Sequence, residues 1–408
     1  MTGLVSGFAH PRSPAATIGS DAEAVAAAHR VAEGLAEGAI DRDRDQMVPI
    51  AEMNALSEAG LLGITVPAAH GGADVSFETV AEVFRILSAA DPAIGQVPQN
   101  HFVCVNVVRE CGTPEQQRFF FAELLRGARF GNAQAERGTS SVLDIATGVY
   151  REGRTYRLRG TKYYCTGALM SDWIPVAALD ESDRTVYAFV PRKAPGVEVL
   201  QDWDPIGQRV TFSGTVRFDN VALAPDQIVA PWPKGAATTL HHAFLTLMHG
   251  AIDVGIARNA WTDTLAALRA RKRPRHGARV TLAQEDPYVL ADLGQGVARL
   301  HALEALLAHA GRALDVARWE GTESTFEAAL VAASGAKALA EDVAIEAASQ
   351  LFALTGSASI NRDLGFDRHW RNARTHTVHD ANQWRYRTVG DWTVNAAAPA
   401  PLVRRRAK

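Results

Sequence analysis

Residues 371–384, RNARTHTVHDANQW, collect titratable and hydrogen-bonding side chains in one short span. His376 and His379 lie three residues apart, and Asp380 directly follows the second histidine. Imidazole has an unperturbed pKa of about 6.5, so a histidine here can donate or accept a proton near neutral pH. His379 is the candidate general acid and His376 the alternative. A histidine that only caps a helix or packs in the core is the ordinary explanation for either.

No glycine or proline occurs between Phe366 and Val389. The pattern therefore predicts one helix on which His369, His376 and His379 lie near a common face. We do not expect a metal site there, because three ligands on one helix cannot surround an ion. Elsewhere in the chain, no carboxylate or cysteine pair has the spacing of zinc ligands.

The composition is that of a large globular protein. The chain has 408 residues, of which 47% are hydrophobic and 21% charged, with a net charge of -3. This charge gives no general attraction to nucleic acid or anionic lipid. The basic cluster Arg404, Arg405 and Arg406 is expected to be a solvated tail. Three cysteines, no signal peptide and no run of 18 apolar residues predict a cytoplasmic protein without a membrane span.

The elements that must position these side chains change character twice. Helical periodicity predicts an N-terminal helical domain over residues 1–126, with the glycine-rich segment 60–72 as a loop between helices. Short alternating runs bounded by glycine and proline predict strands over residues 127–235, and Glu152 with Gly153 predicts a hairpin turn. We expect these strands to form a small antiparallel β-barrel or sandwich.

Residues 236–408 return to helical periodicity. Leu290, Leu293, Val297 and Leu300 repeat every three or four residues, as a helix buried along one stripe requires. Four such helices can close as an up-and-down bundle. The expected helices cover residues 240–270, 285–317, 322–354 and 363–389. The whole chain is thus expected to be mainly α, with a central β domain and a C-terminal four-helix bundle.

Four segments, in this order, resemble the acyl-CoA dehydrogenase superfamily along nearly the whole chain. They are GLLGITVPAAHGG at 60–72, GNAQAERGTSSV at 131–142, GTKYYCTGA at 160–168, and QLFALTGSAS with RHWRNARTHTVHD in the C-terminal part. Two further segments, EDPYVLADLG at 285–294 and THTVHDANQW, resemble the flavin-dependent monooxygenase branch, which includes the dibenzothiophene monooxygenases and sulfur-acquisition oxidoreductases. The resemblance implies the acyl-CoA dehydrogenase fold.

The resemblance also implies where a flavin binds. The flat isoalloxazine ring needs backbone and amide partners at its polar end. The implied cofactor contacts are Asn132, Gln134, Ala135 and Glu136 in the first flavin-facing loop, together with His376 in the C-terminal segment. Thr166 is implied to lie beside the flavin N5, although a threonine in a strand can equally be there for its β-propensity.

His101 matches a histidine that faces the flavin in the monooxygenase branch. In part of that branch a tyrosine follows one turn later, whereas this chain has Val105. Either the polar cluster is assembled differently here or the substrate differs. A helix histidine bonded to a neighbouring loop remains the alternative for His101.

One substitution separates two enzyme classes. The family's dehydrogenases place their catalytic base in a Tyr-Glu-Gly-Thr run, and the equivalent run here is His379, Asp380, Ala381 and Asn382. Asp380 is one methylene shorter than glutamate, so its carboxylate has less reach to a substrate carbon. A monooxygenase instead forms a flavin C4a-(hydro)peroxide, beside which a histidine can serve as proton donor.

The basic stretch 269–279 is where the resemblance implies phosphate binding, and Arg271 and Arg273 are the candidates. A solvated basic loop is the alternative. No NAD(P)H-binding fingerprint occurs, which agrees with reduced FMN supplied by a separate flavin reductase; FAD is the less favoured cofactor. The family's cross-subunit cofactor site and the alanine-rich helices predict a homotetramer.

The sequence therefore predicts a reduced-flavin (FMNH2)-dependent monooxygenase that uses O2 to oxidise a small organosulfur or similar heteroatom compound. Two alternatives stay open at this point. One is an FAD-dependent acyl-CoA dehydrogenase. The other is a non-catalytic binding protein of the same fold, since fold alone does not determine function.

Overall fold

The first third of the chain is helical in the computed structural model, which describes residues 4, 12–141, 143–229, 236–271, 273–274, 276–399 and 405–406. The glycine-rich segment 60–72 is the expected connection between helices, and it contains the short 3-10 turns Leu61–Gly63 and Ala68–His70. The helices are α1 (Asp21–Ala36), α2 (Ala39–Asp45), α3 (Ile50–Glu58), α4 (Phe77–Ala90), α5 (Pro92–Gln96), α6 (Gln99–Cys111) and α7 (Pro114–Leu125).

The middle of the chain forms a seven-stranded sheet in the order β6-β7-β3-β2-β4-β5-β8. Its strands are β2 (Gly148–Glu152), β3 (Thr155–Lys162), β4 (Trp173–Leu179), β5 (Thr185–Pro191), β6 (Val197–Val199), β7 (Val216–Leu223) and β8 (Ile228–Val229). Neighbours are antiparallel except β2 and β4. Gly153, with φ of 62°, makes the expected hairpin turn between β2 and β3. A separate short pair joins β1 (Asp144–Ile145) to β9 (Arg405–Arg406).

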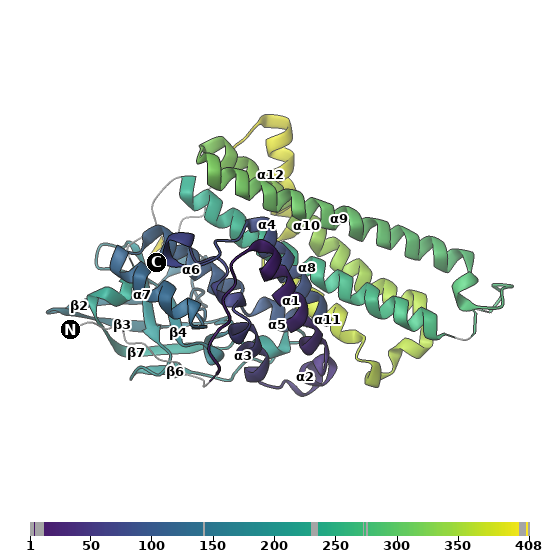
Figure 1. The fold of residues 1–408 in the computed structure, drawn as a ribbon, viewed down its shortest axis with the longest axis horizontal. Helices are drawn as coiled ribbons and strands as arrows, with labels where there is room; N and C mark the ends of the chain where they lie inside the picture. The colour runs from purple at the N-terminus through teal and green to yellow at the C-terminus, as the bar shows by residue number, and fades with distance from the viewer. Residues whose placement is uncertain are drawn as a thin grey trace.

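Long helices form the last part of the chain. They are α8 (Ala236–Ala270), α9 (Pro287–Glu320) and α10 (Glu323–Thr355), followed by the shorter α11 (Asp367–Thr377) and α12 (Asn382–Asn395). In Figure 1 the long helices extend away from the sheet, and the N-terminal helices pack where sheet and bundle meet. The expected fold class is confirmed: mainly α, with a central sheet and a C-terminal helical bundle.

The prediction of one unbroken helix over residues 363–389 is wrong. The helix ends at Thr377, and Ala381 is extended with φ of -80° and ψ of 110° before α12 begins. His379 therefore lies in a connection and does not share a helical face with His369 and His376. Two ion pairs of the Asp380 carboxylate stabilise the break: a local one with Arg385, five residues on, and a tertiary one with Lys337 of α10.

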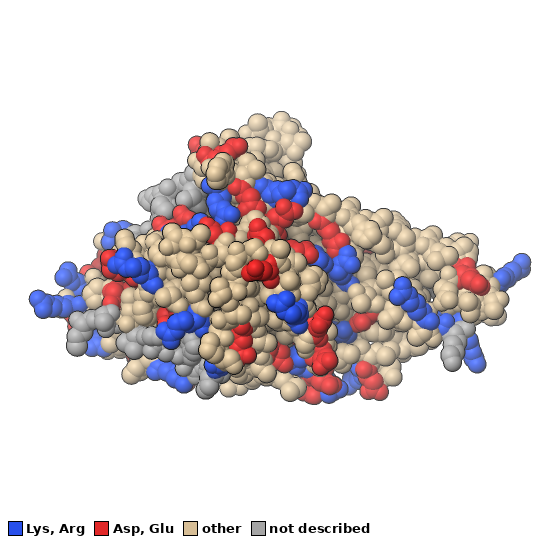
Figure 2. Space-filling model, in the orientation of Figure 1, with Lys and Arg blue, Asp and Glu red and all other residues tan. Residues whose placement is uncertain are grey.

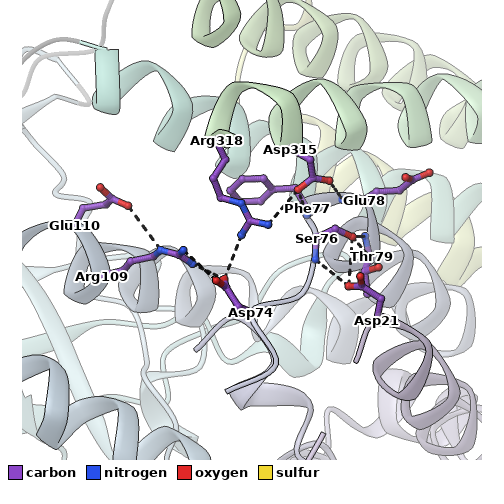
Figure 3. A network of polar contacts seen from close by, with 10 residues as sticks. All are labelled: Asp21, Asp74, Ser76, Phe77, Glu78, Thr79, Arg109, Glu110, Asp315 and Arg318. Atoms are coloured by element: carbon purple, nitrogen blue, oxygen red, sulfur yellow. Dashed lines mark hydrogen bonds and ion pairs between the residues drawn. The ribbon is translucent and has the colours of Figure 1, made fainter. Parts of the chain in front are cut away.

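Hydrogen bonds and ion pairs connect the bundle to the N-terminal helices (Figure 3). Asp315 on α9 accepts hydrogen bonds of 2.8 and 3.1 Å from the first two backbone N–H groups of α4. Asp74, just before α4, binds Arg318 of α9 at 3.3 Å and Arg109 of α6 at 2.7 Å. A carboxylate at a helix N-terminus satisfies otherwise unpaired N–H groups, so this network sets where α4 starts against the bundle.

Helix α8 runs through the core, and close packing determines its neighbours. A Cβ at Gly255 would lie 2.4 Å from the Cβ of Ser88 on α4, so glycine is required for this approach. The apolar stripe expected on α9 is only partly covered in the single chain: Leu300 is buried, but Leu290 is 51% exposed. Within the described residues, no helix has the length and apolarity to cross a membrane.

Candidate active site

Thr166 lies in the connection that follows β3, where it belongs to a chain of hydroxyl groups. Its Oγ1 is 2.7 Å from the hydroxyl of Ser213, which is 2.8 Å from Oγ1 of Thr211. Thr211 in turn donates to the backbone carbonyl of Gln208 at 2.9 Å. All four residues are buried. Each hydroxyl has a single proton, so Ser213 donates to Thr211 and Thr166 donates to Ser213, which leaves the lone pairs of Thr166 Oγ1 free to accept from a ligand.

The loop after α7 meets this hydroxyl chain. Asn132 donates from Nδ2 to the backbone carbonyl of Tyr164 at 3.0 Å, while its Oδ1 is buried and has no hydrogen-bond partner. Tyr164 has φ of 56°, a left-handed conformation that is uncommon for a non-glycine residue. An unpaired buried carbonyl and a strained backbone at the same point are typical of a ligand-binding position.

Gln134 and Ala135 continue the loop along the sheet. The Gln134 amide donates to Oδ1 of Asn100 on α6 at 3.0 Å and accepts from the Tyr187 hydroxyl at 3.3 Å. Ala135 accepts from the backbone N–H of Tyr163 at 2.9 Å. The loop is thereby tied to both α6 and the sheet.

The carboxylate of Glu136 is engaged by the protein itself. It accepts from Lys162 Nζ at 2.7 Å and from the backbone N–H groups of Ala146 and Thr147 at 2.8 and 3.0 Å. Lys162 is fully buried and also donates to the backbone carbonyl of Gln134 at 3.2 Å. The geometry favours a role for Glu136 in holding the loop rather than in direct contact with a ligand.

Both ring nitrogens of His101 are bonded to backbone groups. Nε2 donates to the carbonyl of Leu62 at 2.8 Å, and Nδ1 accepts from the N–H of Phe130 at 3.0 Å. Burial lowers the pKa of His101 to about 4, so the ring is neutral at physiological pH. This geometry matches the alternative weighed from the sequence, a helix histidine that joins two loops.

Three histidine rings meet where the bundle faces the β domain. Nε2 of His376 lies 3.0 Å from Nδ1 of His249 on α8, and Nδ1 of His376 lies 2.6 Å from Oδ1 of Asp253. The ring of His379 stacks on His249 with centroids 4.4 Å apart. His376 and His249 are buried, whereas His379 is exposed. Among the described residues, no group of three His, Cys, Asp or Glu side chains is arranged to hold a metal ion.

An ionic network lies beside the histidines. Lys337 on α10 is fully buried, forms an ion pair with Glu341, and has its Nζ 3.5 Å from Asp380 and 3.9 Å from Asp253. Burial opposes its charge, but the three carboxylates outweigh this effect and raise the pKa of Lys337. For Glu341, burial outweighs Lys337 and raises the pKa to about 7.

Asp380 is held firmly in its ionised form. Its Oδ2 accepts from Nη2 and Nε of Arg385 at 2.6 and 3.0 Å. Burial alone would raise its pKa, but Lys337 and Arg385 outweigh burial and lower the pKa of Asp380 to about 2. A carboxylate in this state is a weak base.

The hydroxyl chain and the histidine cluster are joined through one hydrogen bond. Oδ1 of Asn372 on α11 accepts from the backbone N–H of Gln208 at 2.6 Å, and a Cβ at Gly207 would lie 2.1 Å from the carbonyl oxygen of Arg371. Asn372 lies one helical turn before His376. The β-domain loop bonded to Thr166 therefore sits directly on the helix that carries His376.

Arg271 and Arg273 are not brought to this site. Arg271 donates to the carbonyls of Arg273 at 2.9 Å and Leu354 at 3.4 Å. Figure 1 shows the connection between α8 and α9 at the end of the bundle farthest from the sheet. Lys272 and Arg275, in the same basic stretch, lie outside the described residues, as does Arg404 of the tail.

Several residues of the site were missed from the sequence: His249, Asp253, Ser213, Lys337, Glu341 and Arg385. A signal existed for the pair on α8. His249 and Asp253 stand four residues apart in the otherwise apolar run LTLMHGAIDVG. Two polar residues on one face of a buried helix require partners from elsewhere.

The residues of the loop, hydroxyl chain and histidine cluster fit a flavin. The unpaired Oδ1 of Asn132 offers one acceptor, and Oγ1 of Thr166, whose own proton is donated to Ser213, offers a second. These are the partners that the polar edge of an isoalloxazine ring requires.

Comparison with known proteins defines the class. Family models of the N-terminal, middle and C-terminal domains of acyl-CoA dehydrogenase match residues 22–128, 133–221 and 247–384. The chain therefore belongs to the acyl-CoA dehydrogenase family, and its similarity is to the flavin-dependent monooxygenase branch.

Two relatives and one crystal structure illustrate the similarity to this branch. Dibenzothiophene monooxygenase of Rhodococcus qingshengii is 31% identical over 399 residues, spanning 94% of this chain and 95% of the relative. The probable FMNH2-dependent monooxygenase SfnC of Pseudomonas putida is 31% identical over 386 residues, spanning 93% and 96%. The crystal structure of FMN-bound TdsC from Paenibacillus sp. A11-2 superposes with a TM-score of 0.87 at 32% identity, covering 93% of this chain and 98% of TdsC.

Proposed function

We propose that this chain is a reduced-FMN-dependent monooxygenase that oxidises a small organosulfur or similar heteroatom compound, with FMNH2 supplied by a separate NAD(P)H-dependent flavin reductase. The observation that carries the proposal is the contrast between His379 and Asp380. His379 is the exposed ring of the histidine cluster, while its neighbour Asp380 is locked by two cations. The site thus offers an accessible imidazole and no free carboxylate at this position.

The state of Asp380 argues against the dehydrogenase alternative. Removing a C–H proton from an acyl thioester requires a carboxylate that is basic and can reach the carbon. With Arg385 bonded to it and a pKa of about 2, the Asp380 carboxylate is a poor base. A polar cluster with an accessible imidazole also argues against a binding protein without catalysis.

Bound reduced FMN supplies the electrons that activate O2, of which one atom enters the substrate and the other leaves as water. The protein's part is to hold the ring and deliver protons. Asn132 and Thr166 would bind the polar edge of the ring, supported by Gln134 and the Glu136–Lys162 ion pair. Burial, opposed by Asp380 but assisted by Lys337, His376 and Arg385, lowers the pKa of His379 to about 4, so His379 would donate its ring N–H proton as the neutral imidazole.

Assembly as a homotetramer is part of the proposal. The basic stretch with Arg271 lies at the far end of the bundle, where basic side chains project in Figure 2, so it can reach a phosphate near Thr166 only in another copy. Large apolar side chains are exposed on the bundle, as a contact surface requires. They include Tyr288 (77%), Leu290 (51%), Trp319 (91%), Trp384 (63%) and Val394 (81%).

The function is tested by supplying the purified protein with FMN, NADPH, a flavin reductase and dibenzothiophene under 18O2. The expected product is the sulfoxide or sulfone carrying 18O, detected by mass spectrometry only when the chain is present. Oxidation of acyl-CoA thioesters with an artificial electron acceptor, without oxygen transfer to any heteroatom substrate, would establish the dehydrogenase instead. We place the reaction in the cytoplasm, where NAD(P)H is available to the reductase.

Assembly is tested by light scattering. A tetramer of the 43.8 kDa chain is expected at micromolar concentration. A monomeric mass, or FMN binding unchanged in Arg271→Ala, would contradict the shared phosphate site.

A further inference from the structure

His249 lies between His376 and His379, and the proposed reaction gives it no role. It comes from α8 and lies between the two histidines of the C-terminal segment. Its Nδ1 is 3.0 Å from Nε2 of His376, and its ring centroid is 4.4 Å from that of His379, with the two planes inclined by 32°. His249 is thus the contact that joins the buried His376 to the accessible His379.

Hydrogen-bond chemistry orders this cluster. The carboxylate of Asp253 is only an acceptor, so Nδ1 of His376 carries a proton and donates to it at 2.6 Å. In neutral His376 the Nε2 is then an acceptor, and His249 must donate from Nδ1. The remaining nitrogen of His249, Nε2, holds a lone pair. Asp253 therefore selects the tautomer of both histidines.

The same bonds form a path for a proton. If Nε2 of His249 accepts a proton, its Nδ1 proton can pass to Nε2 of His376, whose Nδ1 proton can pass to Asp253. Each transfer breaks one N–H bond and forms one N–H or O–H bond, so no electron or further reactant is needed. Oδ2 of Asp253 is buried without a hydrogen-bond partner, 3.9 Å from Lys337 Nζ.

Burial and the surrounding charges favour the neutral form of His249. Burial, followed by His379, His376, Lys337 and Arg385, lowers the pKa of His249 well below its usual range. The titratable and charged groups that face it come from α8, α10, α11, the following connection and α12: Asp253, Lys337, Glu341, His376, His379, Asp380 and Arg385. Near pH 7 the two cations are opposed by two carboxylates and by Glu341, whose pKa is about 7.

We propose that His249 and Asp253 are positioning residues of the monooxygenase: together they set the tautomer of His376, and His249 holds the ring of His379 by stacking. This inference rests on the proposed function for its effect on catalysis. The tautomers themselves are a property of the protein without flavin. They can therefore be measured independently of any activity.

The first measurement is the tautomeric state of the histidines in flavin-free protein carrying 15N-labelled histidine, by ring-nitrogen NMR with assignments from single histidine variants. In the wild type, His376 and His249 should both carry the proton on Nδ1. Asp253→Asn should move both toward the Nε2–H form, because the Asn amide can donate to His376. Unchanged tautomers in Asp253→Asn would overturn the proposal.

The second measurement is product formed per NAD(P)H consumed, across pH 6–8.5. His249→Phe keeps a ring for stacking but removes the hydrogen bond, and should lower the product yield roughly tenfold, less than the ~100-fold that a 1 Å misplacement can cost. His249→Asn, whose Nδ2 can stand in for the Nδ1–H donor but which has no ring to stack on His379, should restore the tautomer of His376 and recover only part of the yield. Equal yields and pH profiles in His249→Phe and wild type would overturn the proposal.

A matched control exists on the same two helices. His369 on α11 donates to Asp263 on α8 at 2.7 Å and is equally buried, but has no contact with His249 or His379. His369→Phe should destabilise the fold yet leave the product yield per NAD(P)H unchanged. A comparable loss of yield in this control would show that any buried histidine here acts only through stability, and would refute the positioning role of His249 and Asp253. If the wild type shows the expected tautomers but oxidises no heteroatom substrate, the proposed function fails while the tautomer assignment stands.

Discussion

His379→Ala should impair catalysis but hardly change the stability of the fold, whereas His376→Ala should clearly lower the stability. The His379 ring is exposed and makes no side-chain hydrogen bond among the described residues, so its loss should change the free energy of unfolding by less than ~1 kcal/mol. His376 is buried and loses two hydrogen bonds, one of them to a carboxylate. Ordinary hydrogen bonds contribute about 0.5–1.5 kcal/mol and bonds to charged groups about 1.5–3, so His376→Ala should cost about 2–4 kcal/mol.

The loss of catalytic activity should be largest in His379→Ala, the variant that loses the least stability. Loss of a positioned general acid costs about a hundred- to ten-thousand-fold in rate, so His379→Ala should divert electrons from NAD(P)H to hydrogen peroxide while the fold stays intact. Urea unfolding and product formed per NAD(P)H, with free-flavin oxidation subtracted, measure both effects. His309→Ala, an exposed histidine on α9, is the control and should match the wild type. A stable His379→Ala protein with wild-type yield would refute the assignment of His379 as proton donor.

Three other perturbations test the supporting structure. The pKa of His101 is about 4 in the folded protein and about 6.5 in the unfolded chain, so its contribution to stability is present above pH 6.5 and is lost as pH falls. Between pH 7 and pH 5 the free energy of unfolding should fall by about 2 kcal/mol. Urea titrations should show that His101→Gln removes this pH dependence. Lys162→Met leaves Glu136 buried and unpaired, so FMN affinity and stability should both fall, the latter by about 3–5 kcal/mol, and the further change Glu136→Gln should restore part of each. Asp315→Ala removes the acceptor of the first two N–H groups of α4, while the N-cap Ser76 stays, and should lower the free energy of unfolding by about 1–2 kcal/mol; an unchanged thermal midpoint would show that the network in Figure 3 does not stabilise the fold.

The order of structural classes was readable from the sequence because it depends on local periodicity. Helical spacing before residue 126 and after residue 236, and alternating runs between them, correspond to elements that bury one face each. The hairpin at Gly153 was equally local. Propensity failed at the fourth long helix, where the absence of glycine and proline predicted continuity. The helix instead breaks at Asp380, whose ion pair with Lys337, 43 residues earlier, local propensity cannot reveal.

Types and spacing of residues indicated which chemistry to expect: the run from His379 to Asn382 stands where the resemblance implies a dehydrogenase base, and the loop at Asn132 precedes a strand edge. Tertiary structure alone decided which side chains are free to act. It bonded both nitrogens of His101 to backbone, neutralised Glu136 with Lys162, and left His379 exposed. The partners of His376 come from α8, 123 and 127 residues away along the chain. Packing brings such distant groups together, and a buried polar atom must find its partner wherever the fold places one.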